Sequence, residues 1–132
     1  MSFQWLQMRI SEEKDRLQRE AKIRASLPKA FEELRVNLLE CVGTYNSAFE
    51  EPSKLEAEGE TMRITLGNDH VDVKTDYALP GFHVEHGQHQ LSIIIGLLPG
   101  DKLSYRDSEK YLTLEEMTRL ILDRTLFPKL LD

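Results

Sequence analysis

The sequence has only one cysteine, Cys41, and no apolar run long enough to cross a membrane. A single cysteine excludes an internal disulfide and a zinc site built from several thiolates. A transmembrane helix would need about 18 consecutive apolar residues. The first ten residues are partly apolar, but charged residues follow at once, without the small-residue cleavage pattern of a secretory signal. We therefore expect a soluble, cytoplasmic protein.

Short motifs of common catalytic sites are also missing. The sequence contains neither a glycine-rich phosphate loop nor the acidic pattern of a calcium loop. No serine or cysteine stands in a G-x-S-x-G nucleophile elbow, and Cys41 falls on an apolar helix face, where a desolvated thiol is unreactive. These absences favour a non-enzymatic protein, and we expect no cofactor.

Charge is abundant and unevenly distributed. The 132 residues suit a single α+β domain, 30% of them are charged, and the net charge is −6. Residues 1–29 hold seven basic and four acidic side chains, a net charge of +3, whereas the other 103 residues carry −9. An acidic body of this kind argues against nucleic acid as a partner.

The first half of the chain predicts two helices. The first runs from about Ser2 to Ala25 and carries one narrow apolar face, made of Leu6, Ile10, Leu17 and Ala21. Glu13 and Lys14 interrupt this face, which is typical of a helix that lies on the surface or pairs with another helix.

A second helix should begin near Ser26. This serine is placed to cap the helix, and Pro28 falls in the first turn, where backbone donors lack partners. A broad apolar face then continues at three- and four-residue steps as far as Phe49. Pro52 should end the helix.

Residues 54–106 alternate between apolar and polar side chains and predict an antiparallel β-meander of about five strands. Taking Gly87-Gln88 as a two-residue turn places His86 opposite His89 and collects the apolar pairs on one face. Leu55 and Ala57 have the opposite parity to Met62, which indicates a bulge or a break of the strand near Gly59.

The last helix should begin at Thr113, which has capping-box spacing to Glu116. The element order is therefore two helices, an antiparallel meander and a C-terminal helix. Helices segregated from an antiparallel sheet are typical of an α+β domain, in which they pack on one sheet face.

The only dense group of reactive side chains is the stretch from His83 to His89. Because His86 and His89 are cross-strand neighbours in the predicted register, their imidazoles lie close enough to share one Zn²⁺ ion. A third ligand would come from elsewhere, and His70 is the candidate. The alternative is that these are exposed turn histidines that only tune the local charge.

The basic first helix suggests a binding surface for a protein partner. Residues 1–27 are a candidate protruding or partner-docking helix, and its candidate contact residues are Phe3, Trp5, Leu6, Arg9, Arg16 and Arg19. Packing on the acidic body of the same chain is the alternative. Binding to an anionic membrane is the least favoured reading, because the net charge is small and the apolar face weak.

Three functions remain open at this point. We favour a non-enzymatic interaction module that self-associates or binds another protein through the first helix. A small metal-binding or enzymatic domain that uses the turn histidines is the second. The third is a chaperone-like accessory protein that holds an extended segment against a strand edge.

Overall fold

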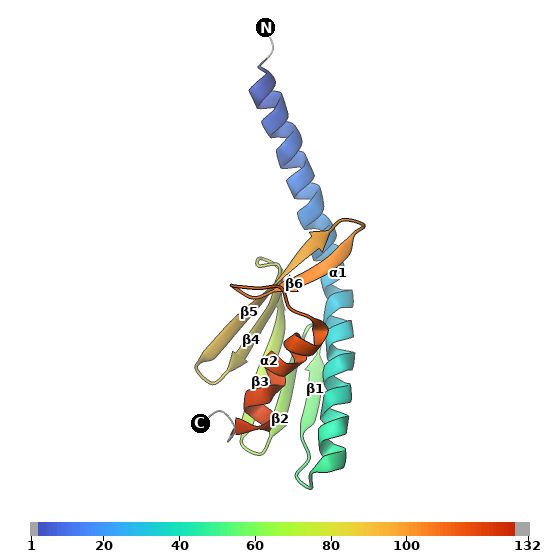
Figure 1. Ribbon diagram of the computed structural model, residues 1–132, viewed down its shortest axis with the longest axis vertical. Helices are drawn as coiled ribbons and strands as arrows, with labels where there is room; N and C mark the ends of the chain where they lie inside the picture. The colour runs from blue at the N-terminus through green and yellow to red at the C-terminus, as the bar shows by residue number, and fades with distance from the viewer. Residues whose placement is uncertain (1–2, 129–132) are drawn as a thin grey trace.

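The computed structural model describes residues 3–128, which form one antiparallel sheet and two helices (Figure 1). In chain order the elements are α1 (Gln4–Ala48), β1 (Lys54–Glu58), β2 (Thr61–Leu66), β3 (Asp69–Asp76), β4 (Gly81–His86), β5 (His89–Leu98), β6 (Lys102–Arg106) and α2 (Leu114–Leu126). The α+β class is confirmed. Neither of the two described helices contains an apolar stretch that could span a bilayer.

The sheet has six strands rather than about five, and they neighbour one another in sequence order. The additional strand arises at Gly59, which has a φ of +60° and forms a tight turn with Glu60. Ala57 and Met62 are consequently cross-strand partners. Of the two predicted alternatives, the chain has the break and not the bulge: the parity changes because the chain reverses there, and partners across a hairpin share a sheet face.

The β4–β5 hairpin has the predicted register, with His86 opposite His89 and Val84 opposite Leu91. Gly87 has a φ of +60°, which a side chain with a Cβ atom rarely adopts. Here the glycine and the apolar alternation agreed on one register, so the pairing could be predicted residue by residue.

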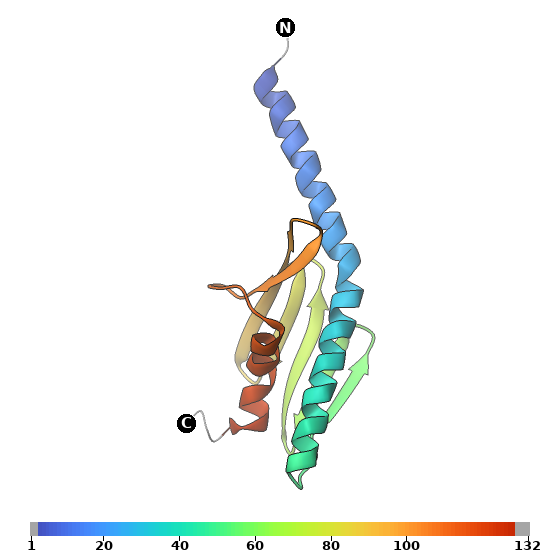
Figure 2. The same ribbon diagram turned by 45° about the vertical axis from the view of Figure 1, so that its right-hand side comes forward.

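The hydrophobic core lies between one face of the sheet and the two helices (Figure 2). The strands contribute alternate residues, all of them buried: Met62, Ile64, Val71, Val73, Phe82, Val84, Ile93 and Ile95. The helices add Leu27, Leu34 and Leu38 from α1, and Met117 and Ile121 from α2. The opposite sheet face is polar and carries an ion pair of 2.7 Å between Arg63 and Asp72.

α1 is one continuous helix where two were predicted, beginning at Gln4; Ser2 lies outside the described residues. Ser26 does not cap a helix, because its Oγ donates to the carbonyl oxygen of Lys22, 2.9 Å away, from within a helical turn. Pro28 lies inside the helix. A proline there costs about 3 kcal/mol or more. Its neighbours Leu27 and Ala30 are buried on the sheet, and we attribute the continuity of the helix to this packing.

Figure 1 shows the upper part of α1 leaning away from the line of its lower part. Prolines commonly bend helices without ending them, because one hydrogen bond is lost and the ring crowds the preceding turn. Pro28 itself is exposed, so the lost hydrogen bond lies on the side that water can reach.

α2 begins as predicted. The backbone N–H of Glu116 donates to Thr113 Oγ1 at 3.1 Å, and the N–H of Thr113 donates to Glu116 Oε1 at 3.1 Å. This capping box satisfies two backbone donors that the first turn would otherwise leave free. Leu112 and Met117, on either side of the cap, are both buried.

Candidate interaction surface

Residues 4–22 of α1 extend beyond the sheet, and we call them the protruding segment (Figure 1). Every residue from 3 to 19 is exposed, and the first buried residue of α1 is Ile23. The β5–β6 turn lies beside the last part of the protruding segment: Lys22 Nζ is 3.5 Å from Asp101 Oδ1, and the turn shares the lining of one hollow with Asp15, Gln18 and Arg19. Most of this segment therefore has no cover from its own domain.

The core row of α1 stops because the positions that would continue it carry charges. One step of seven residues back from Ile23 reaches Arg16, and the same step from Leu27 reaches Glu20. Residues seven apart lie on nearly the same side of a helix. A charged row cannot line a core, so the sequence itself specifies that α1 leaves the sheet here.

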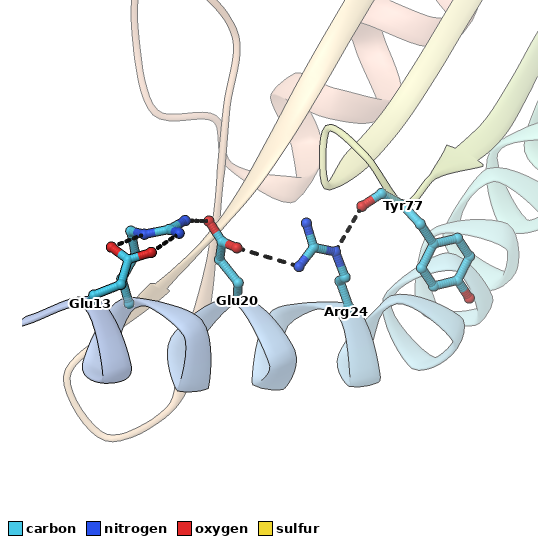
Figure 3. A network of polar contacts seen from close by, with 5 residues as sticks. Glu13, Glu20, Arg24 and Tyr77 are labelled. Carbon is cyan, nitrogen blue, oxygen red and sulfur yellow. Dashed lines mark hydrogen bonds and ion pairs between the residues drawn. The ribbon is translucent and has the colours of Figure 1, made fainter. Parts of the chain in front are cut away.

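These charges form a chain of polar contacts along the helix (Figure 3). Arg16 pairs with Glu13 and, at 2.5 Å, with Glu20. Glu20 also contacts Arg24 at 3.4 Å, and Arg24 Nε donates to the carbonyl oxygen of Tyr77 at 3.0 Å. The hydrogen bond from Arg16 holds the pKa of Glu13 below its ordinary value. The network supports the helix where it loses its core contacts.

A second row of the protruding segment is apolar, and we call Leu6, Ile10, Leu17 and Ala21 the apolar stripe. Leu6 is 43% exposed, Ile10 47% and Leu17 51%. By the 3.6-residue helical period, the stripe lies roughly a quarter turn around the helix from the row that continues the core. A partner could therefore lie along the stripe without meeting the sheet.

The first turns of α1 are apolar on other sides as well. Phe3, Trp5 and Met8 are between 58% and 66% exposed, and we call them the apolar tip. Aromatic residues and methionine are enriched where protein partners meet. The tip adds contact area at the end of the apolar stripe.

The structure separates the predicted contact residues into two groups. Phe3, Trp5 and Leu6 are exposed and apolar. The basic residues are exposed too, but Arg9 pairs with Glu12 at 3.2 Å and Arg16 belongs to the polar network. Arg19 lines a shallow hollow beside the β5–β6 turn. The prediction did not include Ile10, Leu17 or Ala21 as contact residues, although their helical spacing was visible in the sequence.

A groove of about 740 Å³ lies between α1 and α2. An aromatic cluster closes one end, where the ring centroids of Tyr45 and Phe49 lie 4.7 Å apart and Phe127 packs 5.7 Å from Tyr45. Cys41 also lines the groove, and burial raises the pKa of its thiol. The groove cannot be predicted from the sequence, because a helical pattern shows which side of a helix is apolar but not how far apart two helices pack.

The histidines do not gather at one point. His86 and His89 are cross-strand partners, and His86 Nε2 lies 2.7 Å from Asp69 Oδ2. His70 occupies the other sheet face, where it lies 3.6 Å from Asp72. Within residues 3–128, no three His, Cys, Asp or Glu side chains are placed to hold one metal ion. The contact of His86 with Asp69 instead joins the end of β4 to the beginning of β3.

Comparisons of the chain with protein-family models, curated proteins and solved structures found no match. The residues considered for function are therefore those that the chain's own geometry exposes or brings together.

Proposed function

We propose that this protein is an interaction module that self-associates through the protruding segment of α1. The observation that carries the proposal is the apolar stripe: three large aliphatic side chains are about half exposed on a helix that has left its own core. Most helices in proteins gain their stability from the packing of an apolar face rather than from helix propensity. A partner along the stripe would supply that packing.

The energetic gain from covering the stripe is modest for each residue. Fully burying a leucine or isoleucine contributes about 1.5–3 kcal/mol, so a half-exposed side chain contributes about half of that. Two copies would together bury six such side chains from Leu6, Ile10 and Leu17. Association costs several kcal/mol of rigid-body freedom. We therefore expect association that depends on protein concentration rather than a permanent complex.

The charge of the segment is compatible with a second copy. Its basic side chains are largely balanced within the helix by Glu12, Glu13 and Glu20. Because the two surfaces are nearly neutral, two protruding segments would not strongly repel each other.

A matched pair of double variants tests the proposal. Ile10→Glu with Leu17→Glu adds two carboxylates to the stripe, whereas Gln4→Glu with Ser11→Glu adds two on another side of the same helix. Light scattering over a range of protein concentrations should show self-association for the unmodified chain and the control, and a monomer for the stripe variant. Circular dichroism should show that all three are folded.

Two results would contradict the proposal. One is a monomer at all concentrations for the unmodified chain. The other is an equal mass for the stripe variant and the unmodified chain, which would place the contact elsewhere.

A further inference from the structure

The positions of the apolar stripe are symmetric about its midpoint along the helix. Leu6 and Ala21 are equally far from the midpoint between Glu13 and Lys14, and so are Ile10 and Leu17. The two residues that interrupt the stripe stand at its centre and carry opposite charges. A surface with this pattern is complementary to a reversed copy of itself.

We infer that the protruding segments of two copies pair antiparallel about a two-fold axis between Glu13 and Lys14. This inference rests on the proposed self-association and assigns the surface of the second copy that receives the helix. It places Ile10 opposite Leu17 of the other copy, and Leu6 opposite Ala21. A two-fold contact of this kind uses the same patch on both copies and therefore closes at a dimer.

The centre of this pairing is electrically balanced. Glu13 of each copy shares a layer with Lys14 of the other, so two carboxylates, each also paired with Arg16 of its own helix, and two ammonium groups meet at the axis. A shift by one helical turn would set these charges against aliphatic residues of the other copy and leave them partly desolvated without a partner. The charged centre therefore fixes the register, as a polar residue within a helix seam does.

Side-chain volumes favour the antiparallel direction. Reversal places the large Leu6 opposite the small Ala21, so the two fill one layer at each end. A parallel pair would set Ala21 opposite Ala21 and leave a gap. Reversal also brings Phe3 opposite Arg24, whose side chain is 42% exposed, so a cation can approach an aromatic ring.

The length of the protruding segment fits the antiparallel pair as well. Position 4 of one copy comes opposite position 23 of the other, where α1 first meets its own sheet. The pair thus ends where each core begins, and the two sheets lie at opposite ends. The β5–β6 turn contacts Lys22, whereas Ala21 and Leu17 point to another side of the helix.

Spin-label distances measure the direction of pairing. The full chain would carry Cys41→Ser and Gln4→Cys, with the label on the new thiol outside the stripe. In the antiparallel pair the two labels are separated by nineteen helical positions, or roughly 30 Å along the axis at the helical rise of about 1.5 Å per residue. A distance distribution centred at about 30–40 Å supports the inference. A parallel pair would give about 20 Å or less and would overturn it.

Charge exchange at the centre tests the register. Glu13→Lys and Lys14→Glu should each reduce self-association at low salt by about tenfold or more, because each leaves four like charges at the axis. An equimolar mixture of the two variants should restore the unmodified dissociation constant, since each Glu13→Lys copy then faces a Lys14→Glu copy. Failure of the mixture to associate better than either variant alone would overturn the register.

These results separate the inference from the proposed function. If the Ile10→Glu/Leu17→Glu variant is monomeric but the labels lie close together, the self-association stands and the antiparallel pair is wrong. If the unmodified chain is monomeric throughout, both are wrong.

Discussion

Arg24 Nε donates to the carbonyl oxygen of Tyr77, 3.0 Å away, at the point where α1 leaves the sheet. Tyr77 follows β3, so this bond joins the helix to a turn 53 residues later in the chain. The Tyr77 hydroxyl also donates to Glu60 Oε1 at 2.6 Å. The end of the protruding segment that adjoins the sheet is thus held by a hydrogen bond as well as by the packing of Ile23.

Replacing Arg24 by alanine should loosen this attachment without unfolding the domain. The variant loses the bond to Tyr77 and the contact with Glu20, but exposed pairs contribute less than about 1 kcal/mol. We expect hydrogen exchange in residues 15–26 to become several-fold faster, while the core strands stay protected.

Arg35→Ala is the matched control, because within residues 3–128 Arg35 pairs with Glu32 of the same helix, at 2.5 Å, and with no other carboxylate. Exchange in residues 15–26 should then remain as in the unmodified chain. Equal effects of the two substitutions would mean that the Tyr77 contact does not hold the helix.

Leu38 and Leu39 offer a sharp test of the core. Leu38 is fully buried between α1 and the sheet, whereas Leu39 is 46% exposed. Leu38→Ala should lower the free energy of unfolding by about 2–5 kcal/mol, because it removes buried methyl groups and leaves a cavity. Leu39→Ala should change it by less than about 1 kcal/mol. Urea denaturation of both variants measures the difference, and similar losses would contradict this packing of α1.

The β4–β5 register could be predicted because local signals agreed with one another. Gly87 supplied the turn, the alternation on both sides supplied the faces, and only one register satisfied both. The capping box at Thr113 was readable for the same reason, since it depends on residues three positions apart.

Features that depend on tertiary packing could not be predicted from the sequence. Ser26 and Pro28 have the sequence of a helix start, and α1 continues through them with buried residues on both sides. The apolar spacing of Leu17 and Ala21 was visible, but whether a partner or the same chain covers it depends on tertiary structure. The groove between α1 and α2 likewise depends on the separation of two helices that are distant in sequence.

The capping box of α2 should contribute measurably to stability. Thr113→Ala removes the side-chain acceptor for the Glu116 N–H and should cost about 1 kcal/mol. Thr113→Ser keeps a hydroxyl at the cap and should recover most of that loss. Thr118→Ala is the control, because Thr118 lies past the cap and its Oγ1 donates to the carbonyl oxygen of Glu115 within the helix. Thermal unfolding of the three variants measures these differences in stability. An equal loss of stability in Thr113→Ala and in the control would show that the cap does not stabilise the protein.

The same cap should make stability depend on pH. The hydrogen bond from Lys110, followed by those from Thr113, holds the pKa of Glu116 below its ordinary value of 4.5. Because the folded pKa is the lower one, ionised Glu116 stabilises the fold above the pKa of the unfolded chain. That contribution is lost as pH falls through the folded pKa. Glu116→Gln removes the titrating group, so the stability difference between the unmodified chain and this variant should shrink on acidification.

Denaturant unfolding at several pH values between neutral and strongly acidic measures this difference directly. Lys110→Ala adds an independent check, because it removes the largest cause of the shift. The Glu116 carboxyl, followed by NMR, should then titrate closer to its ordinary value, while Asp107 keeps a low pKa through its bonds from the backbone of Glu109 and Lys110. A stability difference that stays constant through the acid range would show that Glu116 acts at the cap only by its shape and not by its charge.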